Sequence, residues 1–266
     1  GGTVLNSTDS VVFTKMVSLA MTGIYSNYSM LLTYIQQFIG QILGNFTASV
    51  GNAIQKMSDD DYYKLFKKIN FLGLWVASIV SVGVYGVIDD FIRVWLGDKY
   101  VLDATTTMIV VIQLFITLSK ITSGAFTNAA GLFVMDKIRP LIEAVLNLVI
   151  SIILTFYMGI SGVFLGTIIS MALTVCWREP YLLYKYSFKK SVFDYWKIYL
   201  MFSGLSVMAG LTIAAIRPFI EVNSFGAVIL EGVAVEVVIN LVFVGVFFRS
   251  EEFRGLKGML MRLLKK

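Results

Sequence analysis

The sequence contains no histidine, which removes the side chain that most often acts as a general base or a zinc ligand. It has a single cysteine, Cys176, so no internal disulfide can form. Only 15% of its 266 residues are charged, against about 25% in an average soluble domain. These absences exclude zinc proteases and histidine-dependent acyltransferases, and they give no reason to expect a metal ion or another cofactor.

Apolar residues dominate the chain. They make up 57% of it, the mean hydropathy is +0.79, and apolar runs of about 20 residues recur. This pattern predicts an all-α integral membrane protein, a polytopic bundle of about eight transmembrane helices, since a membrane β-barrel would alternate with period two. Because the sequence starts at Gly1 and shows no signal peptide, we expect a fragment that lacks an N-terminal part. The expected spans are residues 4–20, 28–50, 69–88, 104–130, 138–158, a sixth from the turn at 159–162 to about 184, then 198–216 and 225–248.

The lysine and arginine residues agree with these spans. If the loops alternate between two sides, one side carries only Arg93, Lys99 and Arg217. Lys15 and Lys120 fall inside spans, and every other basic residue lies on the opposite side. Cytoplasmic loops of bacterial membrane proteins collect such residues, so we expect a protein of the bacterial plasma membrane with both ends cytoplasmic. The same distribution accounts for the net charge of +5 without nucleic acid as a partner.

One expected helix carries a polar stripe. From Ser29 to Ser49, every fourth position of an otherwise apolar segment is polar. Because a step of four residues drifts by about 40° round a helix, neighbouring members of the series share a face. Such a stripe either hydrogen-bonds to another helix or forms a wall of a water-filled cavity, and the sequence leaves both interpretations open. The series is Ser29, Thr33, Gln37, Gln41, Asn45 and Ser49.

Two lysines lie inside expected spans, where charges are costly and tend to line pathways or to pair. Lys120 is near the middle of 104–130, and Lys15 lies two turns from Asp9. Either lysine can be purely structural, for example in an Asp9–Lys15 pair. Our hypothesis is that both give a cavity a positive potential suited to an anionic ligand such as a phosphate-bearing lipid. The polar face of 104–130 comprises Gln113, Thr117, Lys120, Gly124, Thr127 and Asn128, and the candidate substrate-binding residues are Lys15, Gln37, Gln41, Asn45, Lys120 and Asn128.

The last expected span carries two carboxylates. Glu231 and Glu236 are five residues apart, about 140° round a helix, so they do not share a face, whereas Glu236 and Asn240 do. A proton-coupling carboxylate, a lateral hydrogen bond or an interfacial position are all compatible with this pattern.

Several segments resemble the polysaccharide, or O-antigen type, flippases of the multidrug/oligosaccharidyl-lipid/polysaccharide exporter superfamily. The resemblance covers residues 1–190 and rests on the order and spacing of the segments more than on any one of them. The matching segments are TDSVVFTKMVSLAMTGIYSNYSML from Thr8, NFTASVGN from Asn45, DDFIRVWLGDKYVL from Asp89, SGAFTNAAGLF from Ser123, KIRPLIEAVLNLVISI from Lys137 and GISGVFLGT from Gly159.

The resemblance implies two six-helix lobes that face a central cavity. Residues 1–190 would be the second lobe, 191–249 two trailing helices and 250–266 a basic cytoplasmic tail on anionic membrane lipid. It also implies export of an undecaprenyl-pyrophosphate-linked oligosaccharide by alternating access, for cell-surface polysaccharide biosynthesis. The partner of this bundle would be the missing N-terminal lobe of the same protein, because alternating access needs two bundles.

Other classes of function remain open at this point. A multidrug or cation exporter of the same superfamily would favour carboxylates in the cavity, where this chain supplies lysines. A membrane-embedded glycan enzyme would be expected to carry a large extracytoplasmic loop, and every such loop here is short. A non-transporting membrane scaffold would use the polar stripes only for packing. We therefore expect a transporter and not an enzyme.

Overall fold

The computed structural model describes residues 19–54 and 57–256, except for the side chains of residues 19–20, 45–54 and 218. Within this part of the chain all regular structure is helical, which confirms an all-α helical bundle. The α-helices are α2 (Leu19–Ile54), α3 (Asp59–Leu96), α4 (Ala104–Ser119), α5 (Ile121–Ala129), α6 (Arg139–Met158), α7 (Ile160–Leu173), α8 (Val175–Leu182), α9 (Phe193–Ile216) and α10 (Phe225–Phe247). Short 3-10 turns are η1 (Asp98–Tyr100), η2 (Leu132–Asp136) and η4 (Arg217–Phe219), and η3 (Leu183–Phe188) is a π-helix.

Six segments of the described chain are long and apolar enough to cross a membrane. They are α3, the pair α4 and α5, the stretch Leu132–Met158 that contains α6, the stretch Ile160–Phe188 that contains α7 and α8, α9, and α10. Helix α2 is not among them, although its 36 residues include no charged side chain. Its polar stripe lowers its hydropathy, which weakens its affinity for lipid. The first expected span, 4–20, falls almost wholly outside the described residues.

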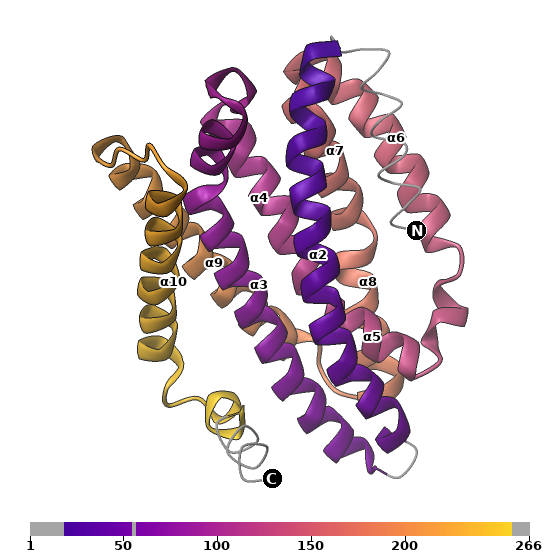
Figure 1. Cartoon of the computed structure of the whole chain (residues 1–266). Helices are drawn as coiled ribbons and strands as arrows, with labels where there is room; N and C mark the ends of the chain where they lie inside the picture. Colours follow the sequence, from indigo (N-terminus) through magenta and orange to yellow (C-terminus); the bar gives the residue numbers. More distant parts are fainter. Residues whose placement is uncertain (1–18, 55–56, 257–266) are drawn as a thin grey trace.

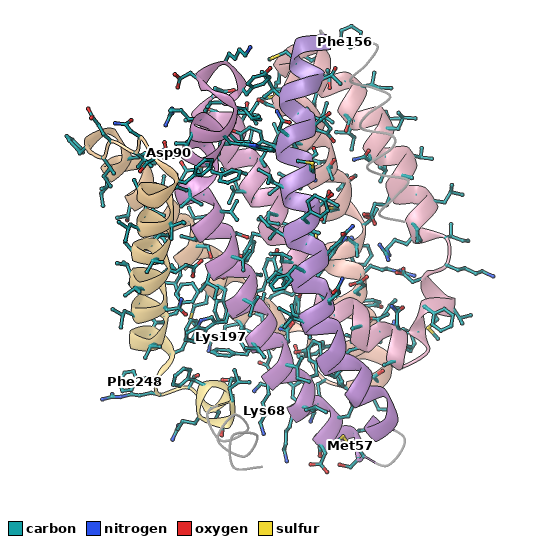
Figure 2. All side chains as sticks on the ribbon, in the orientation of Figure 1. Met57, Lys68, Asp90, Phe156, Lys197 and Phe248 are labelled. Carbon is teal, nitrogen blue, oxygen red and sulfur yellow. The ribbon has the colours of Figure 1, made fainter. Side chains whose placement is uncertain are left out.

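Helix α3 is the central element of the bundle. It packs against α4, α9 and α10, while α2 packs across α4 and α5 (Figure 1). Successive spans run in opposite directions, so the loops alternate between two ends. Met57 and Lys68 lie at one end of the bundle, and Asp90 and Phe156 lie toward the other (Figure 2).

Aromatic side chains fill the core at the end of the bundle where α3 begins. Tyr62 and Phe66 on α3 pack against Phe126 on α5, with ring centroids 5.4 and 5.1 Å from the Phe126 centroid. Phe188 of η3 packs on the other side of the same two α3 rings. Offset and edge-to-face ring packing of this kind fixes the separation between α3, α5 and η3.

Helices α6 and α7 form a close hairpin because small residues lie between them. A Cβ placed on Gly166 would be 2.7 Å from the Ser151 Cα, and one on Gly162 would be 2.4 Å from the Leu154 carbonyl oxygen. The buried Asn147 side chain donates to Thr167 Oγ1 at 2.9 Å. Backbone-to-backbone contact with lateral hydrogen bonds is the usual way in which helices associate in lipid.

Helices α9 and α10 attach to α3 through a separate aromatic layer. Phe202 on α9 stacks on Phe247 on α10 with ring centroids 4.5 Å apart, and both rings contact Phe71 on α3. Trp75 Nε1 donates to Asn240 Oδ1 at 3.1 Å. These contacts hold the expected trailing pair on the outside of α3.

The first residues of the expected basic tail fold back onto the bundle. The ring of Phe253 stacks on Trp75 at 5.6 Å, and Lys67 pairs with Glu252 at 3.0 Å. The remainder of the tail, from residue 257 on, lies outside the described residues.

Candidate functional site

The expected span 104–130 is interrupted at Lys120. Helix α4 ends at Ser119, α5 begins at Ile121, and Lys120 lies between them with φ −84° and ψ −9°. Lys120 keeps a right-handed helical backbone and its carbonyl accepts from the Gly124 N–H at 2.9 Å, so α4 and α5 form one candidate span, Ala104–Ala129, with a local irregularity at Lys120.

A second interruption lies in the neighbouring span. Thr174 separates α7 from α8 with φ −121° and ψ −90°, and α8 contains Pro180, which lacks a backbone N–H. The two interrupted spans pack side by side, α4 on α7 and α5 on α8. Broken helices at membrane depth are tolerated where protein or water covers them, and transporters use such breaks to build binding sites.

A buried charge cluster lies beside these breaks. The Arg139 guanidinium, at the first residue of α6, hydrogen-bonds to three carboxylates, those of Asp136, Glu143 and Glu179. The Arg139 Nη1 to Glu143 Oε2 distance is 2.7 Å, and the Arg139 Nη2 to Glu179 Oε1 distance is 3.4 Å. All three carboxylates are buried. Arg178 adds a second cation, with its Nε 3.2 Å from Asp136 Oδ1.

Lys120 adds a third positive charge beside the three carboxylates of this cluster but forms no direct ion pair with them. It is half-buried, and its ammonium acts electrostatically on Glu179 and on Cys176. Ser123, at the start of α5, donates to Glu179 Oε2 at 3.1 Å. Among the described residues no ion pair within 4.0 Å involves Lys120, so its ammonium retains the capacity to bind a further anion.

The polar stripe of α2 is exposed along part of its length. Gln37 and Gln41 are exposed, and they share that surface with Tyr34 and Phe38, which are 62% and 65% exposed. Helix α10 differs, because every exposed residue on it is apolar. Amide side chains are poorly suited to hydrocarbon, so this side of α2 is suited to water or to another polar protein surface.

The structure places the expected site residues in two groups. Gln37 and Gln41 lie on α2, while Lys120 lies at the helix break and Asn128 is exposed near the end of α5. Within the described part of the chain, no hydrogen bond or ion pair links either glutamine to Lys120 or Asn128. Two further expected residues cannot be placed: Lys15 and the side chain of Asn45 lie outside the described residues.

The carboxylates and arginines of the cluster were not predicted as a site, because Arg139 and Arg178 were counted only among the basic residues of the more basic membrane side. A local signal was present in the spacing of Asp136, Arg139 and Glu143, which places a carboxylate three residues before and four residues after one arginine. Glu179 followed by Pro180 inside an apolar span was a second signal.

A second buried network closes the opposite end of the bundle. Asp89 accepts hydrogen bonds from Tyr28 Oη at 2.6 Å and from Thr107 Oγ1 at 2.9 Å. Arg217 bridges Asp89 and Asp90 through its two terminal nitrogens. Burial alone would lower the pKa of Arg217, but the two aspartates raise it above its ordinary value, so this residue stays charged. Because the network joins α2, α3, α4 and η4, we assign it a structural role.

Comparisons with known proteins add no identification. A scan against protein-family models found no match, and neither the curated proteins nor the solved structures contain a significant match.

Proposed function

We propose that the chain is one bundle of a bacterial plasma-membrane transporter that exports an anionic, lipid-linked oligosaccharide. The observation that carries this proposal is the contrast between α2 and the lipid-facing helices. Helix α2 exposes Gln37 and Gln41, whereas the exposed surface of α10 is entirely apolar. A helix with amides on its free side fits the wall of an aqueous cleft better than a lipid boundary.

In this mechanism the exposed side of α2 faces a second bundle, the N-terminal lobe that the resemblance implies. The glutamine amides hydrogen-bond sugar hydroxyls, and Lys120 attracts the pyrophosphate of an undecaprenyl carrier. The lipid tail stays in the bilayer while the two bundles rock about the cleft and expose it alternately to each side. Both chain ends are cytoplasmic in this arrangement, because the basic loops lie at the end where α3 begins.

The state of the charges favours an anionic over a cationic substrate. The carboxylates of Asp136, Glu143 and Glu179 are already paired with arginines, so they are poor sites for a drug cation. Lys120 is the cation of the cluster that lacks an ion pair within 4.0 Å among the described residues. A phosphate group can therefore bind Lys120 without breaking an existing pair.

Thiol labelling tests whether α2 lines an aqueous cleft. In a Cys176→Ser background, Gln41→Cys in intact membranes should react with a membrane-impermeant methanethiosulfonate, because only a hydrated thiol ionises and reacts. Val145→Cys is the matched control, since Val145 is 54% exposed on α6, which presents an apolar surface to lipid. If the Gln41→Cys thiol reacted as little as the Val145→Cys thiol, the assignment of α2 to a cleft would be wrong.

A transport assay tests the substrate class. The chain, together with an N-terminal lobe, is reconstituted in proteoliposomes with a fluorescent undecaprenyl-pyrophosphate oligosaccharide. Flipping of this probe, and not of a fluorescent cationic drug, is the expected result. If Gln41→Cys reacts with the thiol reagent but the probe is not flipped, the assignment of α2 to a cleft stands and the proposed substrate is wrong.

A further inference from the structure

Helices α9 and α10 enclose a groove on the outside of the bundle. Each packs on α3, and a cavity of about 680 Å³ lies between them and extends to Arg217 at the start of η4. Its wall is almost entirely apolar, with Met208 and Ile213 on the α9 side and Ala234 and Val242 on the α10 side. A cavity of this volume suits a small amphiphile or a single lipid chain.

The charged groups of the groove gather at one end. Arg217, Glu221 and Glu231 line it there, close to the start of α10. Glu231 is six residues into α10, about 9 Å along the helix from its first residue, so it lies nearer to the η4 end of α10 than to its other end. Its Oε2 atom is buried and has no hydrogen-bond partner. This carboxylate therefore has unused hydrogen-bond acceptor capacity beside the groove that Glu231 lines.

The charge at this mouth is negative. Arg217 is occupied by Asp89 and Asp90, at 3.0 and 2.9 Å, and Asp90 also pairs with Arg93. Arg93 pairs with Asp98 as well, so two guanidinium groups face three aspartates, and Glu231 adds a carboxylate that acts electrostatically on Arg217. The excess of negative charge favours a cationic headgroup and disfavours a phosphate that has no cation beside it.

We propose that the groove between α9 and α10 binds a membrane phospholipid with a primary ammonium headgroup. The ammonium donates to Glu231, and one acyl chain lies along the apolar wall toward Val242. The bound lipid comes from the leaflet at the η4 end of the bundle. This site is independent of the proposed transport cleft, because α2 and Lys120 do not line the groove.

Native mass spectrometry of the full chain in detergent tests the proposal with palmitoyl-oleoyl phosphatidylethanolamine and phosphatidylglycerol as probes. We expect phosphatidylethanolamine to bind about tenfold more tightly, the effect of one charge-assisted hydrogen bond. Glu231→Gln should remove the preference, and Glu231→Lys should reverse it. Glu236→Gln is the matched control, because Glu236 lies on α10 against Gly83, outside the groove.

A second variant tests the place of the acyl chain. Ala234→Trp fills the groove and should weaken binding of both lipids by a similar factor. An unchanged headgroup preference in Glu231→Gln and Glu231→Lys would overturn the proposal. Displacement of phosphatidylethanolamine by undecaprenyl phosphate at equal concentration would also overturn it, because an anionic isoprenoid would then be the favoured occupant.

Discussion

Arg217 and Asp89 are 128 residues apart in the sequence, and the Arg217 Nη1 atom lies 3.0 Å from Asp89 Oδ2. Asp89 is on α3, whereas Arg217 immediately follows α9, so the pair ties the expected trailing helices to the lobe. The Tyr28 hydroxyl donates to the other oxygen of the same carboxylate and brings α2 into the contact. One buried carboxylate therefore links parts of the chain that the sequence keeps far apart.

Arg217→Ala should destabilise the protein by about 3 kcal/mol, because it leaves two buried aspartates without their shared cation. The measurement is thermal unfolding in detergent. Lys99→Ala is the control, since Lys99 is an exposed cation at the same end of the bundle and should change stability little. Equal melting temperatures for the two variants would show that the network contributes nothing.

Asp103 should make part of the stability depend on pH. It caps α4 by accepting from the Thr106 N–H at 3.0 Å, and the hydrogen bonds from Thr106 outweigh burial and lower the pKa of Asp103 below its ordinary value. Because the pKa of Asp103 is lower in the folded than in the unfolded protein, the ionised carboxylate stabilises the fold at pH values above the unfolded-state pKa. This stabilisation is lost as the pH falls through the folded-state pKa. Asp103→Ala should cost about 1 kcal/mol at neutral pH.

The same comparison made at acid pH provides the test. The stability difference between the wild type and Asp103→Ala should shrink below about pH 4, where the wild-type carboxylate takes up its proton. Asp103→Asn is the control, because asparagine caps helices well and does not titrate. A difference that stays constant down to pH 3 would contradict this role of the ionised carboxylate.

Most of the fold was predictable from the sequence because hydropathy and length determine the spans. Helix α6, Arg139–Met158, agrees closely with the expected span 138–158, and Pro140 is tolerated in its first turn because a proline there costs no helix hydrogen bond. Gly83 on α3 allows a close approach of α10, since a Cβ on Gly83 would meet Glu236 Oε1. Glu236 and Asn240 share a face of α10, as predicted, and the Asn240 side-chain amide donates to Glu236 Oε2 at 3.4 Å.

The helix breaks were not predictable in the same way. No glycine or proline lies next to Lys120, so the local sequence favours a continuous helix there. The irregularity at Lys120 lies where α5 begins, and α5 contacts α2, α3 and α8, which are contacts that a single sequence does not reveal. Likewise, the pairing of Arg139 with Glu179 joins residues 40 apart, beyond the reach of helical periodicity. The roles of Lys15 and Asn45 stay predictions.

The effect of glycine-to-alanine substitutions on stability should distinguish glycines at close helix contacts from glycines on the free surface. Gly166→Ala should lower stability by about 1–3 kcal/mol, because its Cβ would meet the backbone of Ser151, which cannot move aside. Gly245→Ala on α10 is the control, since no atom lies within 4 Å of its Cβ position. That variant should gain about 0.5–1 kcal/mol from better helix propensity. Similar changes in melting temperature for both would mean that α6 and α7 are not closely packed.

Two variants of the charge cluster should have different effects: Arg139→Gln should lower stability, and Lys120→Gln should lower the rate of transport. Arg139→Gln removes the shared partner of three buried carboxylates and should lower the melting temperature strongly. Lys120→Gln breaks no ion pair within 4.0 Å, so it should leave the melting temperature nearly unchanged while it slows flipping of a pyrophosphate-linked oligosaccharide about tenfold or more. Lys120→Arg should restore much of the rate, because it keeps the charge. Normal flipping by Lys120→Gln would make this lysine structural, and the anion would then have to bind elsewhere in the cleft.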